Sequence, residues 1–338
     1  MRVLLTGASS FTGYWFAATL SQAGHHVVMP LRGAQGTYVS QPRANRVRLL
    51  QELGEVVWSC PFGSDRFLDL VRREPVDILC HHAAQVKDYR SDSFDVLAAL
   101  ENNTHRVSEL MSSAANIGAI VLTGTVFEFD EGIGDEPMRA FSPYGLSKGL
   151  TFQVFRYWCL KRGIPFGKFV IPNPFGPYEE ARFVSYLLNC FLRRQVATVG
   201  TPSYIRDNIH VDLLAKCYAA FCDTVGKSAR SITKCNPSGY VESQAAFAFR
   251  VSREMRKRLG LPCDVVAAVQ TDFPEPLIRS NDQMASRMVP AWCEDHAWDQ
   301  LVQYYDERNV ASGHGANGLP NAALGDPGCR PGQSGFPS

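Results

Sequence analysis

Short apolar runs alternate with helix-length segments through the first half of the chain, and this rhythm limits the possible folds more than any other feature. Apolar runs of five to seven residues between helices are typical of strands buried on both faces, as in a parallel sheet covered by helices. Right-handed crossovers then give a doubly wound parallel α/β sheet. The expected strands span residues 2–6, 27–31, 56–60, 76–82, 117–123 and 166–172, and the expected helices span 12–23, 43–53, 65–73, 93–116 and 143–162.

The rhythm changes after Pro172. Three prolines within residues 172–177 predict irregular structure there. Beyond them we expect a smaller mixed α/β domain that closes over the carboxyl edge of the sheet. Its helical patterns span residues 183–194, 210–224 and 244–259.

These patterns divide the chain into three parts. We expect the parallel sheet over residues 1–172 and the smaller domain over 173–310, with some segments of the smaller domain returning to the sheet. Residues 311–338 are rich in glycine and proline, with seven and four of these residues. Such a segment cannot bury enough apolar surface to form a packed core. We expect this last part to be a disordered tail.

Charge and composition argue against several kinds of partner. The chain has 34 Lys and Arg against 33 Asp and Glu, so its net charge of +1 offers no electrostatic basis for binding nucleic acid or an anionic membrane. No apolar run approaches the roughly 18 residues of a membrane span. The first strand begins too early to leave room for a signal peptide, and the ten cysteines follow no paired spacing. We therefore expect a cytoplasmic protein with reduced thiols and no metal site.

The segment Thr-Gly-Ala-Ser-Ser-Phe-Thr-Gly, residues 6–13, follows the first expected strand and opens the first helix, which is the context of a dinucleotide-binding loop. Gly7 permits a tight turn, and Gly13 lets the helix pack closely on the strand. The helix N-terminus then offers N–H groups and partial positive charge to a pyrophosphate. Ser10 replaces the middle glycine of the usual pattern, so a glycine-bearing turn without a ligand stays open as the alternative. The fold expectation thus becomes an NAD(P)-binding Rossmann domain.

The end of the second expected strand bears on the type of dinucleotide. NAD sites usually place an acidic residue there to bind the ribose 2′-hydroxyl. This chain instead has Met-Pro-Leu-Arg-Gly, residues 29–33, with no carboxylate. The guanidinium of Arg32 matches the geometry of a 2′-phosphate, so we predict NADP as the cofactor, with NAD possible. An ordinary solvated Arg32 is the alternative.

A Tyr-x-x-x-Lys pair begins the helix expected after residue 142. Ser142 is a good N-cap and Pro143 a good first residue, so Tyr144 and Lys148 lie one turn apart on one helix face. A tyrosine with an ordinary pKa near 10 is a poor acid–base catalyst at neutral pH. We expect the Lys148 ammonium, together with a nicotinamide cation, to lower the pKa of Tyr144 towards 7, a shift of about 3 units.

Together these segments resemble the extended short-chain dehydrogenase/reductases, specifically the NAD-dependent epimerase/dehydratase branch that acts on nucleotide sugars. The resemblance covers about residues 1–305. It is carried by the loop at 6–13, by Asp-Ile-Leu-Cys-His-His-Ala-Ala at 77–84, by the Tyr144 and Lys148 pair, by Asn-Pro-Phe-Gly-Pro at 173–177 and by Tyr-Ile-Arg-Asp-Asn-Ile-His-Val-Asp at 204–212.

The resemblance implies a role for each matching residue. Thr123, Tyr144 and Lys148 are implied to be catalytic, with the Thr123 hydroxyl bonded to the reacting sugar oxygen. Asn173 and Arg206 are implied to hold the phosphates of the substrate, for which a guanidinium is suited. The implied cofactor-binding residues are Gly7, Ser9, Ser10, Phe11, Thr12, Gly13, Arg32, Ala83, Ala84, Lys148 and Pro172.

The resemblance also bears on assembly, and one of the implied roles has an alternative. The helix that starts at Pro143 helps to build a four-helix dimer in relatives, which implies a homodimer. An ion pair with Asp207 or Asp212 is the alternative role for Arg206.

Departures from the family pattern narrow the reaction. Dehydratases of this branch carry carboxylates directly after the catalytic threonine, where this chain has Gly124 and Thr125, so 4,6-dehydration is disfavoured. The remaining reading is an NAD(P)-dependent 4-ketoreductase or 4-epimerase that uses Thr123, Tyr144 and Lys148. A non-catalytic NADP-binding regulatory protein and a reductase of a non-sugar carbonyl compound are the alternatives.

Overall fold

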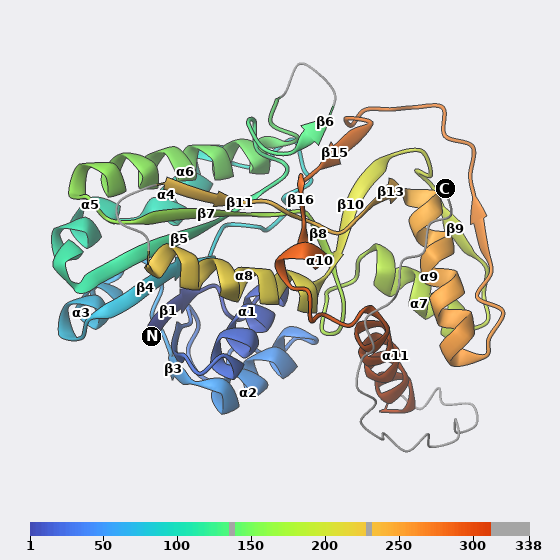
Figure 1. Cartoon of the computed structure of the whole chain (residues 1–338), viewed down its shortest axis with the longest axis horizontal. Coiled ribbons are helices and arrows are strands. Elements are labelled where there is room, and N and C mark those ends of the chain that lie inside the picture. Colours follow the sequence, from blue (N-terminus) through green and yellow to red (C-terminus); the bar gives the residue numbers. More distant parts are fainter. Residues whose placement is uncertain (135–138, 228–231, 312–338) are drawn as a thin grey trace.

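A seven-stranded parallel sheet organises the larger part of the molecule (Figure 1). The structure is a computed structural model that describes residues 1–134, 139–227 and 232–311. The strand order is β11-β7-β5-β4-β1-β2-β3, so the order reverses between β1 and β4, where ligands bind in sheets of this kind. The strands are β1 (Arg2–Thr6), β2 (His26–Pro30), β3 (Glu55–Val57), β4 (Val76–His81), β5 (Ile117–Thr125), β7 (Phe166–Ile171) and β11 (Ile232–Cys235).

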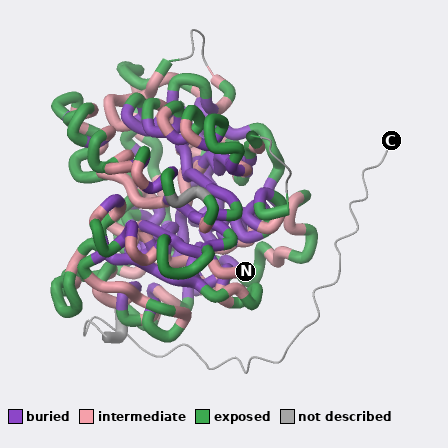
Figure 2. Tube along the Cα trace, turned by 90° about the vertical axis from the view of Figure 1, so that its left-hand side faces the viewer, coloured by how far each residue is buried: buried purple, intermediate pink, exposed green. Residues whose placement is uncertain are grey.

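The strands of this sheet are buried on both faces, as the apolar runs predict. In β1, Val3 and Leu5 join the core on one face of the sheet, and Leu4 joins the core on the other. In β5, Ala119 and Ile120 divide in the same way. Successive side chains of a strand point to opposite faces, so a continuous apolar run supplies both cores at once. Figure 2 shows these buried segments running through the interior of the molecule.

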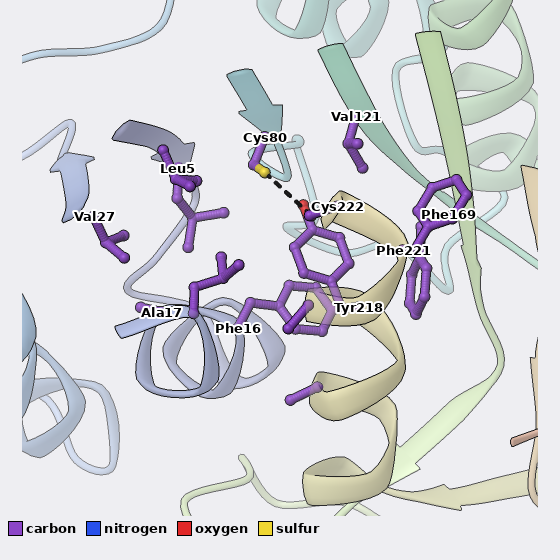
Figure 3. Close-up of a cluster of buried hydrophobic side chains, with 14 of the residues drawn as sticks. Leu5, Phe16, Ala17, Val27, Cys80, Val121, Phe169, Tyr218, Phe221 and Cys222 are labelled. Carbon is purple, nitrogen blue, oxygen red and sulfur yellow. Dashed lines mark hydrogen bonds between the residues drawn. The ribbon is translucent and has the colours of Figure 1, made fainter. Parts of the chain in front are cut away.

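Helices cover both faces of the sheet. One face carries α1 (Phe11–Gln22), α2 (Arg43–Leu53) and α8 (Val211–Gly226), and Phe16 of α1 stacks on Tyr218 of α8 at 3.9 Å between ring centroids (Figure 3). Two parallel aromatic rings therefore join the first helix to one from the second half of the chain. The other face carries α3 (Asp65–Arg73), α5 (Val107–Leu110) and α6 (Pro143–Arg162), with α4 (Val96–Thr104) packed on α6.

The helix expected over residues 93–116 is wrong as a single element. The structure has α4, then a break at His105 and Arg106, then α5 and the 3₁₀ helix η1 (Met111–Asn116). Arg106 adopts a left-handed backbone conformation with φ of 51°, which ends the helical path. Its guanidinium bonds to Asp65 and Glu109, and these contacts hold the break in place.

The smaller region is built from mixed sheets and three long helices. Its five-stranded sheet contains β6 (Ile133–Gly134), β8 (Asn173–Phe175), β10 (Ile205–His210), β13 (Tyr240–Ser243) and β15 (Ile278–Ser280). Two-stranded pairs form between β9 (Ala197–Val199) and β14 (Val265–Ala267), and between β12 (Pro237–Ser238) and β16 (Gln283–Met284). The helices are α7 (Phe183–Leu192), α9 (Gln244–Leu259), the short α10 (Ala285–Met288) and α11 (Glu294–Ala311).

Irregular structure across residues 172–177 is a wrong prediction for the part that forms β8. Asn173, Pro174 and Phe175 pair in parallel with β10. Pro174 has no N–H, but β8 pairs with β10 only on one side, and proline is tolerated at such an edge. The helices expected at 183–194, 210–224 and 244–259 are present as α7, α8 and α9.

The remaining expectations concern the C-terminal tail, membrane crossing and the cysteines. Beyond Ala311, the last residue of α11, the expected tail lies outside the described residues. Within the described residues, no helix combines the length and the apolar character that a membrane crossing requires. Most cysteines of that part of the chain are buried, and Cys80 and Cys222 lie 3.7 Å apart in the core between β4 and α8 (Figure 3).

Candidate active site

A cavity of about 2390 Å³ lies at the carboxyl ends of the central strands and extends under the smaller region. Every residue predicted from the sequence to act at the site lines this cavity, apart from Gly13, which packs behind the loop. The residues brought together there are Gly7, Ser9, Ser10, Phe11, Thr12, Arg32, Ala83, Ala84, Thr123, Tyr144, Lys148, Pro172, Asn173 and Arg206.

The loop between β1 and α1 is held against β4 by glycines that admit no side chain. Gly7 has φ of 76°, and a Cβ there would lie 2.7 Å from the backbone nitrogen of Ala83. A Cβ on Gly13 would lie 2.2 Å from the carbonyl oxygen of Gly7. Ser10 caps α1 by accepting the N–H of Gly13 at 3.1 Å. The first residues of α1 line the cavity, so this helix end presents its partial positive charge to the cavity.

Two arginines face the cavity beside this loop. Arg32 follows β2, is exposed and lines the cavity. Arg43 begins α2, donates to the Ser9 hydroxyl from Nη2 at 2.7 Å, and lies over the ring of Tyr38 at 5.0 Å. The Tyr38 hydroxyl in turn accepts the N–H of Gly33 at 2.8 Å. In the described part of the chain neither guanidinium has a carboxylate within ion-pair distance, so both charges are available to an anion.

Arg46 ties the phosphate loop to the smaller region. Its side chain is fully buried. Nε donates to the carbonyl oxygen of Ser9 at 3.1 Å, Nη1 donates to that of Tyr178 at 2.6 Å, and Nη2 pairs with Glu180. Because Ser9 precedes α1 and the other two partners follow β8, this one guanidinium spans both sides of the cavity.

Thr123 lies at the carboxyl end of β5 with its hydroxyl beside the ring of His82. The Nδ1 atom of His82 is 2.9 Å from Thr123 Oγ1. On the other side of the ring, Nε2 is 3.1 Å from the hydroxyl oxygen of Ser10 and 2.9 Å from that of Thr12. Burial, the Lys148 ammonium and the neighbouring His81 lower the pKa of His82 to about 3, so its imidazole is neutral at physiological pH.

Tyr144 and Lys148 lie in the first turns of α6. Ser142 caps this helix by accepting the N–H of Gly145, and Pro143 occupies its first position. Burial raises the pKa of the Tyr144 phenol above its ordinary value, and the nearby carboxylate of Glu128 raises it further. Burial also lowers the pKa of Lys148 to about 8, against the opposing effect of Glu128. The protein alone therefore keeps Tyr144 as a phenol, because removal of the phenolate from water has the larger effect. The lowered pKa expected with Lys148 and a bound nicotinamide cation stays a prediction.

The substrate end of the cavity contains Asn173 and Arg206. Asn173 donates from Nδ2 to the carbonyl oxygen of Asp207 at 3.3 Å. Arg206 is buried, and its Nη1 donates to the carbonyl oxygens of Ile205, Pro276 and Leu277. Its Nη2 pairs with the Glu275 carboxylate at 2.8 Å.

Two carboxylates at this end have contrasting surroundings. Glu275 is about half exposed and neutralises the Arg206 charge, so Arg206 forms an ion pair with it rather than with Asp207 or Asp212, the partners named in the alternative for Arg206. Glu179 is buried and lines the cavity, and burial raises its pKa to about 8.

Comparisons with known proteins identify the family of the chain. A family model described as NAD dependent epimerase/dehydratase family matches residues 3–232. The chain belongs to this family. It is part of the extended short-chain dehydrogenase/reductases, as the sequence resemblance implies. A search of curated protein sequences finds no match.

Solved structures share this family fold at low sequence identity. UDP-glucuronic acid 4-epimerase from Bacillus cereus, in complex with UDP-glucuronic acid and NAD, superposes with a TM-score of 0.69 at 17% identity, covering 91% of this chain and 100% of that one. UDP-glucose 4-epimerase from Thermotoga maritima gives 0.67 at 15%, covering 91% and 99%. The dTDP-glucose 4,6-dehydratase DesIV from Streptomyces venezuelae gives 0.66 at 19%, covering 92% and 98%.

In this member of the epimerase/dehydratase family, the carboxylate of Glu128 fills the space beside Gly124. An added Cβ on Gly124 would lie 2.7 Å from Glu128 Oε1. Glu128 is fully buried, and its Oε2 lies 2.6 Å from the ammonium of Lys168, which also lies 2.6 Å from Glu131. Glu128, Asp130 and Glu131 have the spacing of a metal site, but the Lys168 ammonium occupies the place between two of these carboxylates.

Several functional groups of the site escaped the sequence analysis. Arg43, Arg46 and Glu275 lie on segments expected to be ordinary helix or loop, and their partners are more than 30 residues away in sequence. His82 lies in the 77–84 segment that carries the family resemblance, but its contacts with Ser10, Thr12 and Thr123 join residues far apart in the sequence. The place of Arg43 and Arg46 in the first turn of the helix expected at 43–53 is the one sequence feature that could have drawn attention to them.

Proposed function

We propose that this protein is an NAD(P)-dependent oxidoreductase of nucleotide sugars, a 4-ketoreductase or a 4-epimerase. The observation that carries the proposal is the shared cavity: Thr123, Tyr144 and Lys148 line it together with the phosphate loop. A protein that only bound the dinucleotide would need the loop but not this acid–base set. Family membership and the nucleotide-sugar enzymes among the solved structures support the substrate class.

The chain's own residues divide the chemistry as follows. The bound dinucleotide supplies or accepts a hydride at the sugar carbon. Tyr144, held as a phenol by burial, donates its proton to the ketone oxygen in the reductive direction. Thr123 hydrogen-bonds to the same oxygen. The ammonium of Lys148, one helical turn after Tyr144, stabilises the phenolate that proton transfer leaves.

NADP is the dinucleotide that we propose for this site. Arg32 and Arg43 approach the end of β2 from two different elements, and neither has a carboxylate partner among the described residues. A guanidinium group can donate two parallel hydrogen bonds to phosphate oxygens, so a 2′-phosphate could accept hydrogen bonds from both arginines. The cradle around Gly7 and Gly13 fits the pyrophosphate of either dinucleotide.

The cofactor is tested by binding measurements with two fragments that differ by a single phosphate. We expect 2′,5′-ADP to bind about tenfold to a hundredfold more tightly than 5′-AMP, a difference of about 1.4 to 3 kcal/mol. Arg43→Ala and Arg32→Ala should each weaken binding of 2′,5′-ADP and leave 5′-AMP unchanged. Arg48→Ala is the matched control, since Arg48 lies on the same helix but pairs with Glu52. Equal affinity for the two fragments would contradict the NADP assignment.

The reaction is tested by turnover. Oxidation of NADPH in the presence of the 4-keto nucleotide sugar formed from dTDP-glucose would support the ketoreductase. Interconversion of UDP-glucose or UDP-glucuronic acid with its 4-epimer, without net use of cofactor, would support the epimerase. Dinucleotide binding without either reaction would favour the non-catalytic alternative.

A second substrate class is favoured by one observation. Glu275 already neutralises Arg206, so the end of the cavity expected to hold a diphosphate carries no free positive charge at that residue. A carbonyl compound without phosphate groups would bind there with the Arg206–Glu275 pair intact. Reduction of simple aromatic or steroid ketones, with no turnover of nucleotide sugars, would identify this class.

We further propose that the protein forms a homodimer through α6. Apolar side chains are exposed along one face of this helix, at positions that recur every three to four residues or multiples of them. They are Leu146, Leu150, Tyr157 and Leu160. Light scattering on the purified chain, with Leu150→Glu as the disrupting variant, tests this assembly.

A further inference from the structure

His82 connects the phosphate loop to the residue expected to contact the substrate. It follows β4, and its ring lies between Ser10 and Thr12 on one side and Thr123 on the other. The three contacts measure 3.1, 2.9 and 2.9 Å between heavy atoms, all within hydrogen-bond range. Its ring also packs edge-on against Phe16 at 5.1 Å, which restricts its rotation.

The ring is neutral, so one nitrogen donates and the other accepts. The charged and titratable groups that act on it, Lys148 and His81, both disfavour protonation, and so does burial. The surroundings of the two nitrogens decide which one carries the proton. Nε2 faces the N-terminus of α1, whose partial positive charge favours a lone pair over an N–H. The Ser10 oxygen already accepts the N–H of Gly13, so its own proton is available for Nε2.

We propose that His82 is a positioning residue that donates from Nδ1 to Thr123 Oγ1 and accepts at Nε2 from Ser10 and Thr12. In this arrangement the Thr123 oxygen receives a hydrogen bond from Nδ1 of His82. The Thr123 proton, which has only a long contact of 3.5 Å with the carbonyl oxygen of His81, can then turn to the ketone oxygen of the substrate. The opposite tautomer would take the Thr123 proton for the histidine and leave Thr123 unable to donate. This role rests on the proposed function, since it assumes that Thr123 contacts the reacting oxygen.

The arrangement has a mechanical consequence. One rigid ring links the first turn of α1, which would hold the pyrophosphate, to the end of β5, which would hold the substrate. A displacement of the phosphate loop is therefore transmitted to the Thr123 hydroxyl. An apolar side chain of similar size would fill the same space against Phe16 but would leave three hydroxyl groups without this partner.

The tautomer is tested directly on the unmodified protein, without any need for activity. In ¹⁵N-histidine-labelled protein, the ring nitrogen shifts of His82, assigned by comparison with His82→Asn, distinguish a protonated Nδ1 from a protonated Nε2. We expect the Nδ1-protonated form at neutral pH, with and without NADPH. The Nε2-protonated form would overturn the proposal whether or not the enzyme reaction is confirmed.

The positioning role is tested by a double-mutant cycle with NADPH and the 4-keto nucleotide sugar as probes. We expect His82→Leu to lower kcat about tenfold to a hundredfold, because the Thr123 hydroxyl is no longer oriented. Thr123→Val should lower kcat by a similar factor, and the double variant should be no slower than Thr123→Val alone. Multiplying losses would overturn the proposal, since they would show that the two residues act independently.

A conservative variant separates the two sides of the ring. The amide nitrogen of His82→Asn lies near the place of Nδ1 but cannot reach Ser10 or Thr12. We expect this variant to keep kcat within about threefold of the unmodified protein while its affinity for NADPH falls. Loss of kcat equal to that of His82→Leu would contradict the donor role of Nδ1. If neither dinucleotide nor 4-keto sugar is a substrate, the proposed function fails and the tautomer measurement still decides the inference.

Discussion

Arg43 and Arg206 lie at opposite ends of one cavity, and their partners differ. Arg43, at the cofactor end, is held by the neutral groups of Ser9 and Tyr38 and keeps its charge for a ligand. Arg206, at the substrate end, already donates to three carbonyl oxygens and pairs with Glu275. The two arginines therefore offer a ligand very different amounts of uncompensated positive charge.

The difference teaches that the two ends are prepared for binding in different ways. An anion at the cofactor end meets donors that are already oriented, so little reorganisation opposes its binding. An anion at the substrate end competes with the half-exposed Glu275 for Arg206. Under the proposed function, selectivity for NADP would follow from donors already oriented in the folded chain, whereas binding of a phosphorylated substrate would require the displacement of one carboxylate.

The largest expected effect comes from Tyr144, which lies between the two ends. Tyr144→Phe removes only the acidic hydroxyl, so turnover should fall about 10²- to 10⁴-fold. Binding of 2′,5′-ADP and of a nucleotide sugar should stay unchanged, because neither end loses a contact. The readouts are NADPH oxidation and fragment affinities measured on the same preparation. Turnover within about tenfold of the unmodified enzyme would remove Tyr144 from the proposed chemistry.

The next largest effect is expected at Arg46, whose side chain connects the loop before α1 to the segment after β8. Arg46→Met leaves the buried carbonyl oxygens of Ser9 and Tyr178 without their donor, and it removes the partner of Glu180. We expect the free energy of unfolding in urea to fall by about 3 kcal/mol. Arg48→Met is the control, because Arg48 and Glu52 form an exposed pair worth about 0.5 kcal/mol or less. Equal losses in the two variants would show that the link across the cavity contributes nothing.

The sequence predicts features of this site that depend on local order. The strands at residues 2–6 and 117–123 follow from apolar runs, and the Tyr144 and Lys148 pair follows from helical spacing after an N-cap. The contacts that distinguish the two ends are of another kind. His82 meets Thr123 across 41 residues and Arg206 meets Glu275 across 69, so neither contact has a local signature. The raised pKa of Tyr144 in the protein alone has no local signature either, because burial is a property of the whole fold.

The two ends should also respond to pH in opposite directions. Burial lowers the pKa of His82 to about 3, so the unfolded chain binds more protons below its ordinary pKa of 6.5, and stability is lost as pH falls from 6.5 towards 3. Burial raises the pKa of Glu179 to about 8, so the folded chain binds more protons between 4.5 and 8, and stability is lost as pH rises through that range.

Paired variants make this pH contrast measurable. Glu179→Gln should gain stability relative to the unmodified protein by about 2 kcal/mol between pH 5.5 and 7.5, and His82→Leu should gain about 1 kcal/mol between pH 6.5 and 5.5. Urea unfolding at each pH gives both differences. A difference that does not change with pH in either variant would show that the corresponding group keeps its ordinary pKa in the folded protein.

The smallest expected effect isolates the feature that separates Arg206 from Arg43. Glu275→Gln removes the charge that competes for Arg206 and keeps the shape of the side chain, so a diphosphate should bind about threefold to tenfold more tightly. Titration with UDP measures this change, and Asp272→Asn, an exposed acidic neighbour on the same segment, controls for the general loss of negative charge. Tighter binding only in Glu275→Gln would show that a diphosphate reaches Arg206 by displacing the carboxylate. No change in either variant would mean that Arg206 and Glu275 form a structural pair, and it would move the expected substrate towards carbonyl compounds without phosphate groups.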